Sequence, residues 1–108
     1  MKNNSTNSKK IEALAEFINM SKSRENMEMV LDNLLTDSEI EKVYDRVKIL
    51  DCLDRGLSQR KTLEEVGGGI ATISRGASMI KNKEFKNFAG FLETARLQAW
   101  WNKLFWRK

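Results

Sequence analysis

Apolar residues recur at helical spacing along most of the chain and divide it into a series of predicted α-helices. A first helix is predicted over residues 9–20 and a second over 25–35, with a polar break at 21–24 between them. Their apolar faces consist of Ile11, Ala13, Leu14, Phe17 and Ile18 in the first helix and Met27, Val30, Leu31 and Leu34 in the second. The polar residues 1–8 precede this pattern and are expected to form a disordered arm.

The longest predicted helix follows the letters TDSE at 36–39, which match a capping box. Thr36 can accept a hydrogen bond from the amide of Glu39, whose side chain can accept one in return. We expect this helix to run to Arg55 and to stop at Gly56. Its apolar residues lie on more than one side: Ile40, Val43, Tyr44, Val47, Ile49, Leu50, Cys52 and Leu53. Such a helix needs packing partners on more than one side.

Shorter elements complete the predicted fold. Ser58 is expected to cap a helix over 59–66, which a glycine turn at 67–69 connects to a helix over 70–81. A final helix is expected to begin near residue 83 or 84 and to run almost to the chain end. Proline is absent and β-branched runs are few, which favours an all-α protein. One domain is predicted, comprising core helices over 9–57, a helix-turn-helix over 58–82 and a C-terminal helix over 83–108.

The helix pair at 58–82, which we call the reading head, has the pattern of a DNA reader. Ile70, Ile73 and Ala77 are placed on the inner side of its second helix, while short polar residues face outward and suit a major groove. Side chains near the ends of the two helices are placed to contact phosphates. The candidate DNA-binding residues are Gln59, Arg60, Ile70, Ala71, Thr72, Ser74, Ser78 and Lys81. A plain corner between two helices is the alternative interpretation of this spacing.

Basic residues are concentrated in the second half of the chain. Residues 1–57 include 9 basic and 11 acidic side chains, and residues 58–108 include 10 basic and 4 acidic ones. The net charge of +4 therefore divides into −2 and +6. This distribution favours a scaffold joined to a part that binds a polyanion. On charge alone, a solvated basic face is an equally good interpretation.

Catalytic and metal-binding patterns are missing from the sequence. With Cys52 as the one cysteine and no histidine, the chain cannot form an internal disulfide, a histidine-centred triad or a histidine-containing zinc site. Cys52 is expected to be a buried core thiol. Because Gly67–Gly69 lacks the lysine of a phosphate loop, no enzyme is predicted. No secretion signal or membrane span is visible, so a cytoplasmic location is expected.

Five sequence features, in this order, resemble the tryptophan repressor family of bacteria: LLTDSE, DRVKIL, RGLSQR, GGGIATISRG and Lys81. The resemblance covers roughly residues 30–82, about half of the chain. It implies an intertwined, six-helix, all-α homodimer in which the reading head extends from a core formed by both subunits. It also implies a transcriptional repressor that binds double-stranded operator DNA, with L-tryptophan or a related indole as corepressor.

The resemblance further implies a ligand site between core and reading head. Arg46 and Arg75 match two arginines that sandwich the indole, an arrangement that suits guanidinium groups and aromatic rings. Thr36 matches a threonine that holds the carboxylate from the partner chain, and Gly76 matches a glycine that leaves room for the ring. Each residue also has a structural alternative: an N-cap, a surface ion pair, a phosphate contact or close packing. A bound ligand would shift the population of reading heads toward a spacing of about 34 Å, one turn of DNA.

The chain departs from the family pattern at several positions. Met79 replaces a serine that faces the amino end of the ligand, and a thioether cannot replace the hydroxyl as a hydrogen-bonding group. The linker before the reading head is one residue shorter than usual, and Lys61 replaces a glutamate. We therefore expect DNA binding to be preserved better than the response to tryptophan.

The chain ends in an amphipathic stretch that the family does not normally carry. Leu97, Trp100, Trp101, Leu104 and Phe105 are expected on one face of a continuous helix, with Trp106 beside them. Three roles are compatible with this face: packing on the partner subunit, lying in a membrane interface, or binding another protein. A ligand-independent module that binds a membrane or protein through residues 97–106 is therefore the alternative function.

Overall fold

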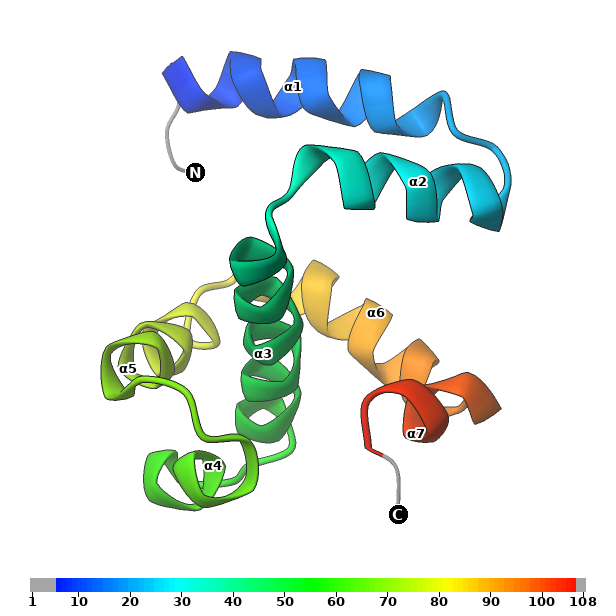
Figure 1. The fold of residues 1–108 in the computed structure, drawn as a ribbon. Coiled ribbons are helices and arrows are strands. Elements are labelled where there is room, and N and C mark those ends of the chain that lie inside the picture. The colour runs from blue at the N-terminus through cyan, green and yellow to red at the C-terminus, as the bar shows by residue number, and fades with distance from the viewer. Residues whose placement is uncertain (1–5, 107–108) are drawn as a thin grey trace. The chain divides into compact units, whose positions relative to one another are not determined.

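The computed structural model describes residues 6–106, and this part of the chain forms seven α-helices (Figure 1). They are α1 (Thr6–Asn19), α2 (Arg24–Leu34), α3 (Asp37–Asp54), α4 (Gln59–Val66), α5 (Ile70–Met79), α6 (Phe85–Arg96) and α7 (Ala99–Leu104). The predicted all-α class is confirmed. The predicted number of six helices is wrong, because the expected single C-terminal helix is two helices. Residues 1–5 of the expected disordered arm lie outside the described residues, and α1 begins at Thr6 instead of Lys9.

The chain divides into two compact units, residues 1–42 and 43–108. In the first unit, α1 and α2 run in opposite directions and are joined at residues 20–23 (Figure 1). Ser23 caps α2 by accepting a hydrogen bond from the Asn26 amide at 3.1 Å. None of the described side chains of α1 and α2 is buried, and six large apolar ones are well exposed: Ile11, Leu14, Phe17, Met29, Leu31 and Leu34.

The predicted capping box at the start of α3 is confirmed. The Glu39 amide donates to Thr36 Oγ1 at 3.1 Å, and the Thr36 amide donates to Glu39 Oε1 at 2.8 Å. The hydrogen bonds from the backbone and side chain of Thr36 lower the pKa of the Glu39 carboxyl below 4.5. The box fixes the start of α3 because it satisfies amides that have no partner within the helix.

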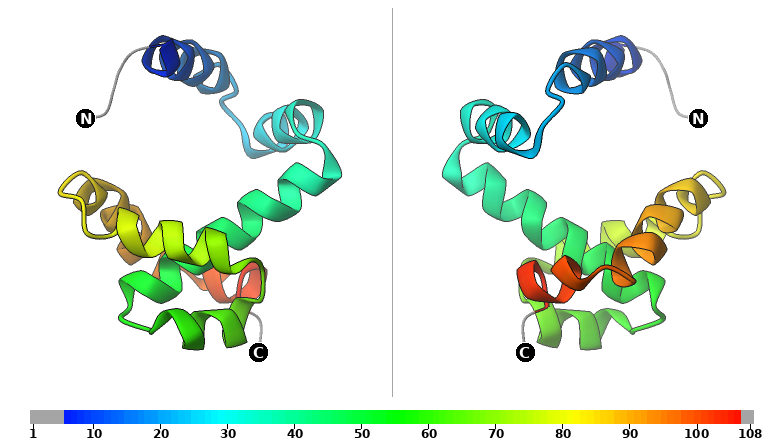
Figure 2. Two further views of the ribbon diagram at one scale, coloured as in Figure 1. Left: turned by 90° about the vertical axis from the view of Figure 1, so that its left-hand side faces the viewer. Right: turned by 90° about the vertical axis from the view of Figure 1, so that its right-hand side faces the viewer.

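The second unit is assembled around the C-terminal half of α3. Figures 1 and 2 show α4 and α5 on one side of this helix and α6 and α7 on another. Residues 49–53 are all buried, and five consecutive helical residues point in every direction around the axis. The expectation that this helix is covered on more than one side is therefore confirmed. Its end agrees with the prediction as well, because Gly56 follows with a φ of 97° and donates to Leu53 O at 3.0 Å.

Two apolar clusters surround this part of α3. One consists of Ile49, Leu53 and Ile73, against which parts of α4 and α5 pack. The other consists of Leu50, Phe85, Leu92 and Trp101, and it joins α3 to α6 and α7. Ile80, directly after α5, packs against both clusters. The two clusters therefore hold the reading head and the C-terminal segment to the same stretch of α3.

The C-terminal segment is not the continuous amphipathic helix that we expected. The chain turns at Leu97 and Gln98, whose amides donate to Thr94 O and Ala95 O, and α7 then folds back along α3. This turn buries Trp101 in the core, whereas a straight helix would leave its ring far from Leu50. Leu97 and Trp100 remain exposed, so the apolar residues of the segment do not share one face.

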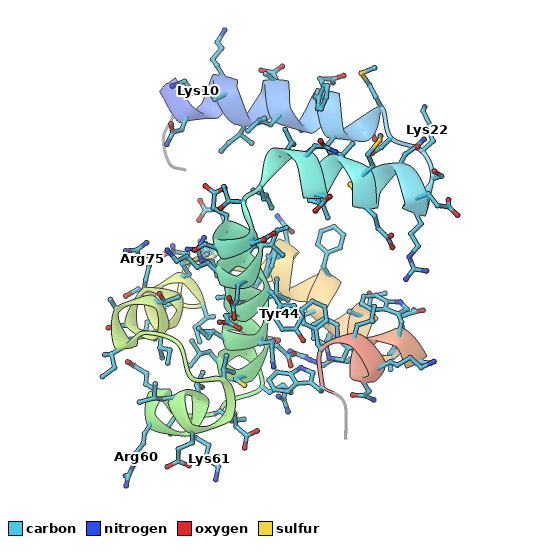
Figure 3. The ribbon with its side chains drawn as sticks, viewed as in Figure 1. Lys10, Lys22, Tyr44, Arg60, Lys61 and Arg75 are labelled. Carbon is cyan, nitrogen blue, oxygen red and sulfur yellow. The ribbon has the colours of Figure 1, made fainter. Side chains whose placement is uncertain are left out.

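Contacts with α3 also hold the last described residues, which we call the aromatic tail (97–106). Tyr44 points from α3 toward the tail and donates to Leu104 O at 2.8 Å, and its ring stacks on Phe105 at 4.8 Å (Figure 3). The structure does not support the alternative of a membrane or protein contact through this segment, because its central aromatic residues face the protein's own α3. No helix in residues 6–106 has the length and apolar character needed to cross a membrane.

Candidate nucleic-acid interface

The first helix of the reading head begins as the sequence predicts. Ser58 caps α4 by accepting a hydrogen bond from the Lys61 amide at 3.0 Å. Thr62 is fully buried, and its hydroxyl group donates to Ser58 O at 2.8 Å. The buried hydroxyl is thus satisfied, and the cap and the helix reinforce each other.

The turn between the two helices depends on glycine. Gly67 and Gly68 have φ angles of 82° and 75°, a region that side chains with a Cβ rarely adopt. The Gly67 amide donates to Leu63 O at 2.8 Å and ends α4. The third glycine precedes α5 directly, so the chain reverses within a few residues and brings the two helices into contact.

The inner face of α5 is held close to α3. Ile73 is buried, and Gly76 lies where a Cβ would be 3.2 Å from Leu53 Cδ1 and 3.4 Å from Leu50 Cδ2. These distances are tighter than ordinary carbon contacts, so a side chain at position 76 would require the ends of Leu53 and Leu50 to give way by a few tenths of an ångström. This is the close-packing role that the sequence left open for Gly76.

The outer face of α5 carries small and polar side chains. Ala71, Ser74, Ser78 and Lys81 are exposed, and Thr72 is partly buried. The prediction that Ile70 lies on the inner side is wrong, since 68% of its surface is exposed. Ile70 is in the first turn of α5, at the margin of the apolar face, and lines a hollow of about 210 Å³ between α4 and α5.

Exposed cations lie on both helices of the reading head. Arg60 and Lys61 extend from α4, and Arg75 extends from α5 on the side away from α4 (Figure 3). Gln59 and Arg60 also line the hollow next to Ile70. Arg60 and Lys61 approach Glu64 only at 3.9 and 3.8 Å on an exposed surface. Pairs of this kind contribute little, so both cations are available to an anion.

The candidate ligand residues are placed in different surroundings. Thr36 uses its hydroxyl in the capping box of α3, and Gly76 faces the α3 leucines. Arg46 on α3 and Arg75 on α5 are exposed, and Met79, the last residue of α5, is 39% exposed. Thr36 belongs to the first unit and the other four to the second. The role of these residues toward a ligand stays a prediction.

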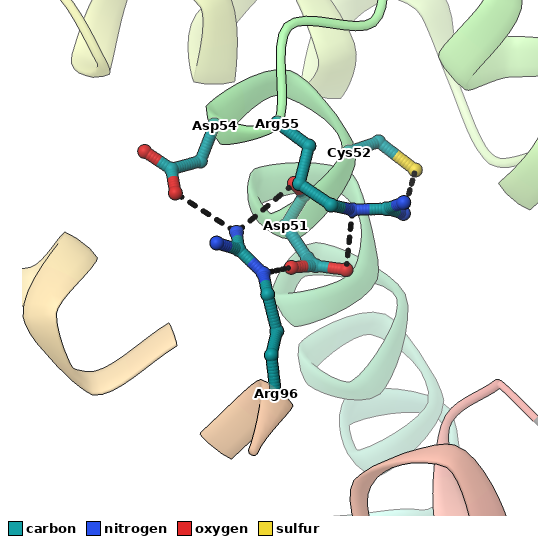
Figure 4. Close-up of polar contacts among 5 residues, drawn as sticks. All are labelled: Asp51, Cys52, Asp54, Arg55 and Arg96. Atoms are coloured by element: carbon teal, nitrogen blue, oxygen red, sulfur yellow. Dashed lines mark hydrogen bonds and ion pairs between the residues drawn. The ribbon is translucent and has the colours of Figure 1, made fainter. Parts of the chain in front are cut away.

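An ionic cluster at the end of α3 was not found by sequence reasoning. Figure 4 shows Arg96 of α6 donating from Nε to Asp51 Oδ1 at 2.6 Å and from Nη2 to Asp54 Oδ2 at 2.8 Å. Arg55 Nε lies 3.3 Å from the second oxygen of Asp51, whose surface is only 1% exposed. Asp51 lies between the apolar residues Leu50 and Cys52, which indicates that its carboxylate needs a positively charged partner in the core. The sequence does not indicate which arginine provides that charge.

Burial and hydrogen bonding shift the pKa of Arg96 in opposite directions. Its partial burial opposes the charged form, but the hydrogen bonds that it donates to Asp54 and Asp51 outweigh that effect and raise its pKa. The Arg96 guanidinium therefore stays charged and ties α6 to the last turn of α3, from which the chain enters the reading head. Cys52, predicted to be a core thiol, is fully buried beside the cluster, and burial raises its pKa.

An all-helical chain that holds a glycine-linked helix pair with its polar face outward has the geometry of a helix-turn-helix regulator. The family model described as Trp repressor protein matches residues 9–95. The Trp operon repressor homolog of Vibrio campbellii is 42% identical over 71 residues, which cover 65% of this chain and 71% of the relative. The homolog of Xylella fastidiosa strain M23 is 32% identical over 78 residues, with coverages of 71% and 85%.

The chain therefore belongs to the Trp repressor family and is a transcriptional regulator of that family, not an enzyme. The resemblance seen in the sequence is confirmed, and the family match extends it from residue 30 back to residue 9 and from 82 on to 95. No solved structure matches the chain.

Two glycines provide a test of the turn. Alanine at Gly67 meets no atom within 4 Å but must adopt a positive φ, so we expect a loss of about 2 kcal/mol in the free energy of unfolding. Alanine at Gly90 also meets no atom within 4 Å, but this residue lies inside α6, and a gain of about 0.5–1 kcal/mol is expected. Urea unfolding at matched protein concentration measures both changes. Equal effects of the two substitutions would contradict the strained turn.

Proposed function

We propose that this chain represses transcription by binding operator DNA as a homodimer, with α5 in the major groove. The observation that carries the proposal is the orientation of α5. Ile73 and Ala77 pack on α3, while Ala71, Ser74 and Ser78 face solvent on the opposite side. Side chains this short let the helix backbone approach base edges, and their hydroxyl groups can donate to or accept from them.

The electrostatics of the second half support a polyanionic partner. Residues 58–108 have a net charge of +6, and both helices of the reading head carry exposed cations. Lys81 lies just beyond the end of α5 and is exposed. Such cations contribute affinity through phosphates, whereas the small residues of α5 would contribute the choice of sequence.

The first unit supports the homodimer. Ile11, Leu14 and Phe17 lie on α1 at spacings of three residues, and each is more than half exposed in the single chain. Apolar stripes of this kind mark protein contacts in soluble proteins. A second copy would bury them, and two reading heads could then contact successive major grooves about 34 Å apart.

The corepressor that we propose is L-tryptophan or a related indole, with Arg46, Arg75, Gly76 and Met79 of one subunit as its site and Thr36 contributed by the partner subunit. Arg46 and Arg75 are exposed and therefore free to stack on an aromatic ring. The ligand would favour DNA binding only as far as it binds the DNA-competent arrangement of the heads more tightly than the other arrangements. Membership of the Trp repressor family supports this ligand.

The DNA contact is tested by removing one cation at a time. Lys81→Ala should weaken binding to a fluorescent duplex and reduce the slope of log affinity against log salt by about 1, because one phosphate contact is lost. Lys103→Ala removes the same charge from α7, and we expect its slope to equal that of the unchanged protein. Fluorescence anisotropy over a range of salt concentrations measures both. Identical slopes for the three proteins would count against the reading head as the DNA site.

The corepressor is tested by calorimetric titration with L-tryptophan, indole analogues and other amino acids. Met79→Ser supplies a hydroxyl that can accept a hydrogen bond from the ligand's ammonium group. The affinity of this variant for L-tryptophan should therefore be about tenfold higher than that of the unchanged protein. Indole, which has no ammonium group, should bind both proteins equally. If neither protein releases heat with any of these compounds, the corepressor proposal is wrong, while the DNA proposal is decided separately by the salt experiment.

A further inference from the structure

We propose that Trp101 of the aromatic tail is a positioning residue for α5. The inference rests on the proposed function in one respect, namely that α5 is the element that binds DNA. Trp101 itself does not lie on the polar face of α5. It acts through the core residues that α5 packs against.

The coupling begins in the cluster that Trp101 shares with Leu50, Phe85 and Leu92. Trp101 is 5% exposed, whereas its neighbour Trp100 is 44% exposed. A buried tryptophan is a large part of a small core, so the position of Leu50 depends on it.

Leu50 connects this cluster to α5. Its Cδ2 atom is 3.4 Å from the point where a Cβ of Gly76 would lie, so the same side chain packs with Trp101 and against the backbone of α5. Ile80, directly after α5, provides a second connection because it packs against both apolar clusters. If Trp101 were replaced by a smaller residue, Leu50 or Ile80 could move into the vacated space. Such a movement would change how α5 packs on α3.

Contacts between α3 and the end of the chain hold the aromatic tail in place. α7 has six residues, too few to be stable as an isolated helix. The Tyr44 hydroxyl bonds to Leu104 O, Phe105 stacks on Tyr44, and Lys48 Nζ lies 4.7 Å from the centre of the Trp106 ring. The cation–π contact and the ring stack fix the tail along α3, which keeps Trp101 in the core.

The aromatic tail lies outside the segment that the Trp repressor family model matches, because that segment ends at Ala95. Its contacts do not require a small molecule, so the tail positions α5 whether or not a corepressor is bound.

The test compares two tryptophans of the same short helix. In amide NMR spectra of the free, folded protein at 25 °C, Trp101→Ala should shift or broaden the resonances of residues 73–80, and Trp100→Ala should leave them unchanged. Trp101→Phe should restore most of the spectrum because it refills the core. Affinity for a DNA duplex should fall about tenfold in Trp101→Ala and less than twofold in Trp100→Ala.

A milder variant covers the case in which Trp101→Ala does not fold. Tyr44→Phe removes the hydrogen bond to Leu104 but keeps the ring, and it should change the same resonances of α5 by a smaller amount. Unchanged α5 resonances in a folded variant of lower stability would show a merely structural role and overturn the proposal. Equal effects of Trp100→Ala and Trp101→Ala would also overturn it. If α5 responds but the unchanged protein binds no duplex at low salt, the coupling is supported and the proposed function fails.

Discussion

The close approach of α5 to α3 is the constraint on which the rest of the structure depends. Gly76 allows it, because a Cβ at this position would lie only 3.2 Å from Leu53 Cδ1 and 3.4 Å from Leu50 Cδ2. The contact fixes the rotation of α5 about its own axis. Once Ile73 and Gly76 face α3, residues such as Ser74 and Ser78 must face outward, since successive helical residues are 100° apart. The face offered to a partner is thus determined by packing on the opposite side.

Further interactions stabilise the packing of the other helices of the second unit on α3. The buried stretch from Ile49 to Leu53 is covered by α5 on one side and by α6 and α7 on another. Asp51 would be costly inside this core without a charged partner, and Arg96 supplies it from α6. The last residues of the aromatic tail extend this cover to Tyr44 and Lys48 of α3. The second unit therefore has a core of its own, whereas the apolar stripes of α1 and α2 are exposed in the single chain.

The parts of the fold that local signals encode were predictable. The capping box at Thr36, the stop at Gly56 and the glycine turn each depend on residues near one another in the sequence, and each is present. The break at Leu97 was not predictable, because a helical stripe does not reveal that a turn would bring Trp101 to the core. The pairing of Asp51 with Arg96 joins residues 45 positions apart and depends on the assembled fold. Of the candidate site, the outward face of α5 could be predicted, but the exposure of Ile70 could not.

Thiol reactivity on the two faces of α5 tests the central claim most directly. Ser74→Cys places a thiol on the outer face and Ala77→Cys places one on the inner face, while the native Cys52 is fully buried. The account predicts that the thiol at 74 reacts quickly in the free protein and becomes protected when duplex DNA is added, and that the thiol at 77 reacts slowly in both conditions. A thiol at 74 that DNA does not protect, or a thiol at 77 that reacts as quickly, would contradict the orientation of α5 and the function that we derive from it.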